Sequence, residues 1–324
     1  MSVQDFLHTN ADTPLCERYM AAGATCSFAT NSENLLAVAR NTFLPVDLPA
    51  DPPPAIGDFS IRFWVDDSHP AQPPWPKPYV RGLDHMVFAG FDARSSLLAD
   101  LRARRAIGRF SAGIVADAGY WKTVIFPILL SVVAGSVGVV ELHASCVAKN
   151  QSGLVLIGPG GSGKSTLAMA LTHAGFRFLA DDRIFCSFKR GKLSAWGMPR
   201  PLKLRPEAAA WFDEFRGREP HDVQNGELVF HCEPNQQFGR QVSRECEPRA
   251  LIFLDRQQSS GFSMTPMERS EAGRRIEIDL MQENPEAVEA QTETIEKLLD
   301  LPCWHLEYGG RPQEIAEQLT RLAG

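Results

Sequence analysis

The sequence has few of the features that mark an extracellular or a nucleic-acid-binding protein. Its seven cysteines are an odd number and include no C-x-x-C pair, so neither a zinc site of that kind nor a disulfide framework is predicted. The net charge of −6 argues against a polyanion such as a nucleic acid as the main partner. The first residues include Asp5 and Asp12 and no apolar segment typical of a signal peptide. We therefore expect a reduced, cytoplasmic protein that binds no nucleic acid.

Long apolar runs are also scarce, and only one approaches the length of a membrane span. Residues 123–140 carry no charge over 18 positions, which is the lower edge of spanning length. Pro127, Gly135 and Gly138 interrupt this run, and Glu141 follows it directly. A buried helix that leads into a core strand explains the run more simply, so we expect no association with a membrane.

The length and composition predict two domains. A chain of 324 residues has room for two, and an apolar fraction of 44% supports a sizeable core. In the first part, proline-rich connectors surround an alternating strand at residues 59–65, and a strand pair follows at 79–91. Residues 95–105 are predicted to form a helix, because Leu97, Leu98 and Leu101 would share one face. We expect a small α+β domain over residues 1–120, whose role the sequence does not indicate, and a second domain over residues 121–324.

After residue 140, apolar strands and helices alternate, which is typical of an α/β domain with a mixed sheet flanked by helices. One helix follows the strand at 154–157 and ends at His173, with Gly175 at the position of a C-cap glycine. Two further helices close the chain, at 286–299 and 312–322. The predicted strands of this domain are 141–147, 154–157, 176–182, 184–188, 193–196 and 250–255.

The segment from 158 to 166, GPGGSGKST, is the most informative part of the chain. It has the complete G-x-x-x-x-G-K-[ST] spacing between a predicted strand and a predicted helix. Glycines let the backbone N–H groups converge on one point, and the helix N-terminus adds its unpaired donors there. The motif therefore predicts a phosphate-binding loop made of Gly158, Gly160, Gly161, Ser162, Gly163, Lys164, Ser165 and Thr166.

Two side chains of this loop have distinct predicted roles. Lys164 would neutralise the outer phosphates of a nucleoside triphosphate, and the Ser165 hydroxyl would bind Mg²⁺. The sequence after the loop contains no N/T-K-x-D element of the kind that selects guanine. We expect the cofactors to be ATP and Mg²⁺.

Phosphoryl transfer also needs a carboxylate near the metal and a base for the acceptor hydroxyl. Two candidates end apolar strands, where such acids belong at the carboxyl edge of a sheet: the pair Asp181-Asp182, and Asp255. A solvated strand end with an Asx turn is the structural alternative for the pair. The spacing alone leaves both interpretations open.

Three segments together resemble the HPr kinase/phosphorylase superfamily, whose core is related to that of ATP-dependent phosphoenolpyruvate carboxykinase. These segments are residues 142–145 (LHAS), the loop at 158–166, and residues 175–183 (GFRFLADDR). The resemblance extends loosely to residue 260 and does not include residues 1–120. Within the superfamily the chain looks most like the kinase-like proteins of peptide-modification systems, including those that phosphorylate lasso-peptide precursors.

The resemblance implies a role for each matching residue. Asp181 matches the general base that acts on the acceptor hydroxyl, and Asp182 matches the residue that places the acceptor and the metal-side groups. His143 matches a histidine expected near the γ-phosphate. A hydrogen-bonded core histidine is the structural alternative for His143.

The sequence also departs from the family pattern. Thr166 stands where a glutamate usually follows the loop serine, and residues 195–205 lack the carboxylate of the family's signature segment. This segment offers Arg200, Lys203 and Arg205 instead, which would stabilise charge on a transferring phosphoryl group or would simply be surface charges. HPr itself and the reverse phosphorolysis are therefore not expected.

The sequence thus predicts a kinase that transfers phosphate from ATP to a hydroxyl, expected to be a serine of a peptide or small protein. Two alternatives stay open: a small-molecule hydroxyl kinase, and a catalytically silent, nucleotide-gated binding module. The sequence leaves open whether the protein forms a homo-oligomer.

Overall fold

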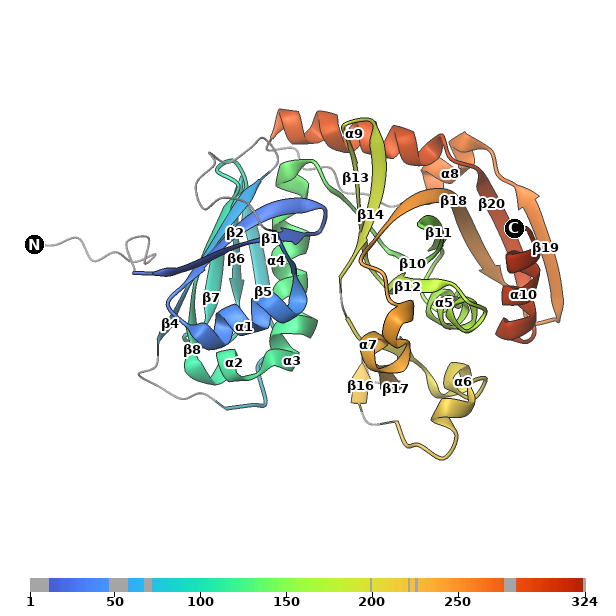
Figure 1. The fold of residues 1–324 in the computed structure, drawn as a ribbon, viewed down its shortest axis with the longest axis horizontal. Coiled ribbons are helices and arrows are strands. Elements are labelled where there is room, and N and C mark those ends of the chain that lie inside the picture. The colour runs from blue at the N-terminus through green and yellow to red at the C-terminus, as the bar shows by residue number, and fades with distance from the viewer. Residues whose placement is uncertain are drawn as a thin grey trace, which may run out of the picture. The chain divides into compact units, whose positions relative to one another are not determined.

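The computed structural model describes residues 12–46, 58–66, 72–198, 200–220, 222–224, 227–276 and 284–322. The chain forms two compact units (Figure 1). Unit 1 comprises residues 1–139 and 280–291, and unit 2 comprises residues 140–279 and 292–324.

Unit 1 is built on an eight-stranded sheet with the order β3-β1-β2-β4-β8-β7-β6-β5. Alternation of buried and exposed side chains along β4 explains why this segment forms a strand with one face in the core. The strands are β1 (Leu15–Ala21), β2 (Ala24–Thr30), β3 (Leu44–Pro45), β4 (Phe59–Asp66), β5 (Tyr79–Leu83), β6 (Met86–Gly90), β7 (Ser96–Asp100) and β8 (Arg105–Ser111). The helices are α1 (Glu33–Thr42), α2 (Ala112–Ala116), α3 (Ala118–Tyr120), η1 (Trp121–Ile125), α4 (Phe126–Val133) and η2 (Gly135–Val137).

The helix predicted over residues 95–105 is wrong. This segment forms β7, a turn and the start of β8, which pair antiparallel with each other. Leu97 and Ala99 are buried, whereas Leu98 between them points to the other face and is half-buried. The three leucines fit the spacing of a helix, whereas a strand needs buried and exposed side chains to alternate. Packing against the neighbouring strands therefore overrides the local preference, and the segment forms a strand.

The boundary between the units lies at residues 139/140, whereas the sequence placed it at 120/121. The reason is that the helices after residue 120 complete the core of unit 1. The ring centroids of Phe126 and Phe43 lie 4.6 Å apart, and those of Trp121 and Phe110 also lie 4.6 Å apart. The aromatic core therefore needs side chains from both sides of the predicted boundary.

Among the described residues, one helical stretch is long and apolar enough to cross a membrane by length and composition, namely Ala118–Val137. Of its most apolar window, 61% is buried inside the protein. Trp121, Ile125, Phe126 and Leu129 have no exposed surface. The buried helix expected from the sequence is present and leads into strand β9 (Val140–Leu142).

Unit 2 contains a nine-stranded mixed sheet and a small three-stranded sheet, which gives the expected α/β class. The main path is β12-β10-β11-β18-β14-β13-β9, and β20 pairs with β18 and β19 beside it. The strands are β9, β10 (Ala144–Lys149), β11 (Ser152–Ile157), β12 (Arg177–Ala180), β13 (Ile184–Lys189), β14 (Lys192–Gly197), β18 (Glu245–Arg256), β19 (Gly261–Pro266) and β20 (Cys303–Gly309); the small sheet has β15 (Leu202–Leu204), β16 (Asp222–Gln224) and β17 (Glu227–Cys232).

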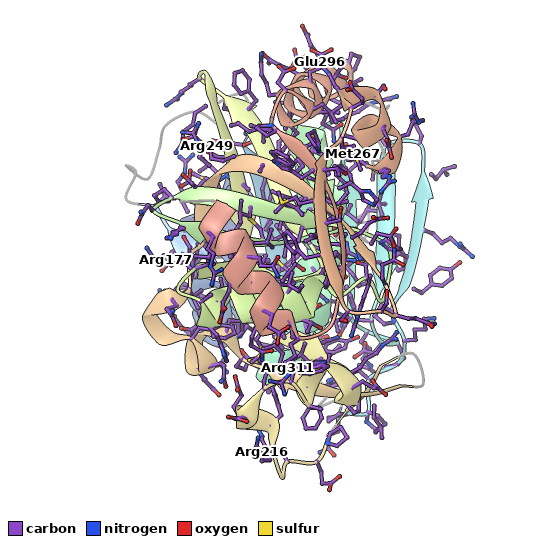
Figure 2. The ribbon with its side chains drawn as sticks, turned by 90° about the vertical axis from the view of Figure 1, so that its right-hand side faces the viewer. Arg177, Arg216, Arg249, Met267, Glu296 and Arg311 are labelled. Atoms are coloured by element: carbon purple, nitrogen blue, oxygen red, sulfur yellow. The ribbon has the colours of Figure 1, made fainter. Side chains whose placement is uncertain are left out.

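The helices of unit 2 position the loop at residues 158–163. Helices α5 and α10 lie side by side against the main sheet (Figure 1), and Arg311 marks the start of α10 in Figure 2. Their apolar side chains share one core cluster with β11 and β18. The helices are α5 (Lys164–His173), α6 (Pro206–Ala209), η3 (Asp213–Phe215), α7 (Pro234–Gln237), η4 (Gly239–Gln241), α8 (Arg269–Arg275), α10 (Pro312–Leu322), and α9 (Pro285–Leu299), which begins in unit 1.

The single strand predicted at residues 141–147 is two strands. Strand β9 pairs with β13, whereas β10 pairs with β11 and β12, so the chain changes partners between them. His143 is the residue at this break, and its side chain is 60% exposed. The break explains how a histidine from an apolar stretch avoids burial in the sheet.

Candidate active site

The glycine-rich loop joins β11 to α5 as the sequence predicts, and two of its glycines have a conformation that other residues rarely adopt. Gly161 and Gly163 have φ angles of +83° and +88°. A Cβ atom on Gly163 would lie 2.2 Å from the hydroxyl oxygen of Tyr308. That hydroxyl donates a hydrogen bond of 2.6 Å to the carbonyl oxygen of Ser162. The end of β20 therefore fixes the loop, and the contact requires glycine at position 163.

The first turn of α5 offers backbone donors to an anion. Gly163 occupies the N-cap position and supplies no side-chain hydrogen bond to the helix. The amide groups of a first turn have no partner within the helix, and the helix dipole places partial positive charge beside them. Gly160 and Gly161 line a cavity next to this turn, and a Cβ at either would meet no atom within 4 Å. The loop thus keeps open the space that a phosphate chain needs.

Lys164 begins α5 and is buried. Its Nζ donates to the carbonyl oxygens of Gly158 and Pro159, at 2.6 and 3.2 Å. Burial lowers the pKa of Lys164, while the charges of Asp181 and Asp182 act in the opposite direction. The ammonium group is therefore held close to both the loop and the acidic pair.

The cavity beside the loop has a volume of about 380 Å³ and brings together most of the residues predicted from the sequence. Gly158, Ser162 and Asp255 are not among its lining residues, although Gly158 and Ser162 shape the loop. Lys203 and Arg205 also line it, beside Arg256. The predicted residues that line it are His143, Gly160, Gly161, Gly163, Lys164, Ser165, Thr166, Asp181, Asp182 and Arg200.

Asp181 is the half-buried residue that directly follows β12 and begins the acidic pair. The hydroxyl of Ser145 donates a hydrogen bond of 2.5 Å to its Oδ1, and Ser165 also hydrogen-bonds to the carboxylate. Burial raises the pKa of Asp181, and the two hydroxyl donors and the charge of Lys164 offset part of that effect. A carboxylate with a raised pKa and a place in a cavity is suited to exchange a proton.

Asp182 has a different environment, although it is the next residue. Its side chain is 49% exposed and lies 3.4 Å from Nη1 of Arg200 and 3.6 Å from Nε2 of His143. Its φ angle is +70°, a left-handed conformation that aspartate tolerates better than most residues. This turn lets two successive carboxylates reach one cavity from a strand end, whereas an extended chain would point them in opposite directions.

The cavity is rich in cations. Arg200 is mostly buried, with 17% of its side chain exposed, and burial lowers its pKa. Lys203 lies on β15, and Arg205 directly precedes α6. Arg256 ends β18. This charge distribution suits a polyanionic ligand such as a triphosphate.

Sequence reasoning missed three residues of this site: Ser145, Arg256 and Tyr308. The alternation of β18 contains a signal for Arg256. Leu254 packs in the core cluster that includes α5, so Arg256, two residues later, faces the same side as the loop and Asp255 faces the other. No local pattern indicates Tyr308, because its contact with Ser162 joins residues 146 positions apart.

No model of a known protein family matches this chain, and no curated protein matches it. Among solved structures 92 chains match, including the HPr(Ser) kinase/phosphatase from Coxiella burnetii. That structure is 14% identical, with a TM-score of 0.32, and the match covers 56% of this chain and 90% of the other. The function is therefore inferred from the residues of the cavity.

Proposed function

We propose that the protein is an ATP-dependent kinase that phosphorylates a hydroxyl group, namely a serine of a peptide or small protein. One observation carries this proposal: the glycine-rich loop and two strand-end carboxylates line the same cavity. A nucleotide-binding module needs the loop alone. The paired carboxylates add the groups that phosphoryl transfer requires, because one carboxylate can serve a metal ion while the other serves the acceptor.

The residues present fit a magnesium ion. The hydroxyl of Ser165 and the carboxylate of Asp182 are hard oxygen donors of the kind that Mg²⁺ prefers, and both line the cavity. These two residues would hold the ion. Bound there, Mg²⁺ would neutralise negative charge on the phosphates of ATP.

Asp181 is the proposed general base. The acceptor oxygen forms a bond to the γ-phosphorus of ATP, the bond to the bridging oxygen of ADP breaks, and the hydroxyl proton passes to the Asp181 carboxylate. The hydrogen bond from Ser145 fixes the orientation of that carboxylate. Lys164 and Arg200 supply positive charge toward the transferred group.

The acceptor class rests on the resemblance of residues 142–145, 158–166 and 175–183 to kinases of peptide-modification systems. The test is to incubate the full chain with ATP, Mg²⁺ and two panels of acceptors, candidate precursor peptides and free hydroxy metabolites. Mass spectrometry should find a phosphoryl increment on a serine of a peptide, and the Asp181→Asn variant should not produce it. An increment on metabolites alone would assign a small-molecule kinase. Nucleotide binding with no transfer to any acceptor would assign a binding module.

Arg200 should affect turnover more than ATP affinity. Its guanidinium lies 3.4 Å from Asp182 and lines the cavity, where charge develops on the transferred group in the transition state. We expect Arg200→Gln to lower kcat by about 10²-fold, the usual effect of removing one aligned donor, and to change the Kd for ATP only slightly. Arg249→Gln, whose side chain is exposed and pairs with Glu247, is the control. Equal losses in kcat and ATP affinity would contradict this role.

A further inference from the structure

A second group of ionisable side chains lies on the main sheet of unit 2, outside the cavity. Strands β18 and β20 run parallel, with Asp255 opposite Glu307 and Phe253 opposite His305. Side chains two positions apart share a face of a sheet. Asp255, His305 and Glu307 therefore lie on one face, and none of them lines the nucleotide cavity.

The three side chains approach one another closely enough to share an ion. One ligand atom from each lies within 4.8 Å of the others, and Nε2 of His305 is 3.7 Å from Oδ2 of Asp255. Two carboxylates directly opposite each other on neighbouring strands repel and destabilise the pairing. A positive charge between them would remove this repulsion.

His305 provides an independent indication. Its Nε2 atom is fully buried and has no hydrogen-bond partner in the described part of the protein. A buried polar atom without a partner is costly, and such atoms in folded proteins call for an explanation. A metal ion bound to Nε2 would satisfy this nitrogen and would neutralise the two carboxylates at the same time.

We propose that Asp255, His305 and Glu307 form a binding site for a divalent transition metal of the zinc type. One imidazole nitrogen and two carboxylate oxygens are a ligand set that suits Zn²⁺, whereas Mg²⁺ and Ca²⁺ take oxygen ligands. The side chain of Asp255 is 51% exposed and Glu307 is also exposed, so water can complete the coordination. Binding of the ion at this site would not require a bound nucleotide.

This site would also stabilise the nucleotide loop. The next register pair of the same two strands is Arg256 opposite Tyr308, on the opposite face of the sheet. Arg256 lines the cavity, and Tyr308 holds the carbonyl of Ser162. A metal that joins Asp255 to Glu307 would fix the strand ends that carry both of these residues.

The test uses the full chain, stripped of metal with a chelator and titrated with Zn²⁺ in the absence of nucleotide. We expect one zinc ion per chain by elemental analysis, and Co²⁺ should give visible absorption bands at the same stoichiometry. His305→Gln and Glu307→Gln should each weaken zinc binding by at least about 100-fold, because removal of outer-shell partners alone costs 10- to 100-fold. Thermal melts of both variants without metal check that the fold is retained.

A matched control separates this site from the nucleotide cavity, which holds a similar pair in His143 and Asp182. The variant His143→Gln should bind zinc as tightly as the wild-type chain. The proposal is overturned if the wild-type chain binds no zinc, if His305→Gln binds zinc with unchanged affinity, or if His143→Gln removes the binding. Loss of phosphoryl transfer in every assay would refute the kinase proposal and leave this one standing.

Discussion

The Lys164→Ala variant should lose most of its affinity for ATP while the fold is retained. In the structure the ammonium group lies at the start of α5, beside the loop carbonyls of Gly158 and Pro159. The proposed phosphates would replace these carbonyls as its partners. A hydrogen bond to a charged group is worth about 1.5–3 kcal/mol, and every 1.4 kcal/mol is tenfold in affinity. We therefore expect affinity to fall by about 100-fold or more when both outer phosphates lose this contact.

Calorimetry with a non-hydrolysable ATP analogue and Mg²⁺ measures this effect directly. Lys192→Ala is the matched control, because Lys192 is exposed, lies in the same unit and pairs with Glu245 outside the cavity. The control should bind the analogue like the wild-type chain, and a thermal melt should show that both variants are folded. Wild-type affinity in Lys164→Ala would mean that the loop does not bind phosphates.

The elements around the loop could be predicted from the sequence because their signals are local. An apolar strand, the glycine spacing and a helix that ends before Gly175 lie within a few residues of one another, and the structure has all three. The strands predicted at 184–188 and 193–196 are likewise present as β13 and β14, which pair antiparallel. In each of these elements, local preference and tertiary packing favour the same conformation.

Residues 95–105 show where local signals fail. Leu97, Leu98 and Leu101 fit a helix, but Leu97 and Leu98 face opposite sides of a sheet. In this sheet β7 pairs with the adjacent strands β6 and β8, and β8 also pairs with the more distant β4. The spacing of the three leucines suits a helix that places all three on one face, whereas the strand and turn bury Leu97 and Leu101 and leave Leu98 half-buried. Only the position of β8 between β4 and β7 decides between them.

The candidate site could be predicted only in part, because some of its residues have local sequence signals and others do not. The loop and the Asp181-Asp182 pair follow directly from sequence patterns, and the structure brings them into one cavity. The contacts that hold them come from elsewhere: Ser145 from β10 and Tyr308 from β20. Different partners also separate the environments of the two adjacent aspartates, because Asp181 accepts from Ser145 and Ser165 whereas Asp182 lies beside His143 and Arg200. The catalytic roles assigned to Asp181 and Asp182 stay predictions.

The Asp181→Asn variant should separate catalysis from nucleotide binding. Asparagine keeps the shape of the side chain and loses the ability to accept a proton. We expect phosphoryl transfer to fall by about 10²- to 10⁴-fold, the usual contribution of a positioned acid or base, with ATP affinity within a few fold of the wild-type value. Single-turnover transfer and calorimetry measure the two quantities separately. Asp255→Asn should have a much smaller effect on transfer, because Asp255 does not line the cavity.

Thermal stability provides a second readout for the Asp181→Asn substitution. Burial of the carboxylate determines whether the variant is more or less stable than the wild-type chain. Burial raises the pKa of Asp181 above its ordinary value of 3.8, so the folded protein keeps this proton to higher pH than the unfolded chain does. The contribution of Asp181 to the free energy of unfolding is therefore fully present below the pKa of the unfolded chain. This contribution is lost as the pH rises through the pKa of the folded protein. Above the folded pKa the wild-type chain carries the cost of a partly desolvated charge, which the neutral amide of the variant does not carry.

We therefore expect Asp181→Asn to melt at a higher temperature than the wild-type chain at neutral pH, and the difference should shrink as the pH falls toward the ordinary pKa of an aspartate, about 4. An active site that retains a charge for catalysis loses some stability because of it. Removal of that charge is therefore expected to give a variant that is less active and more stable. If Asp181→Asn were instead destabilised at neutral pH and lost ATP binding, the carboxylate would be holding Ser165 and Lys164 in place. The base would then have to be sought at Asp182, which the Asp182→Asn variant tests with the same two assays.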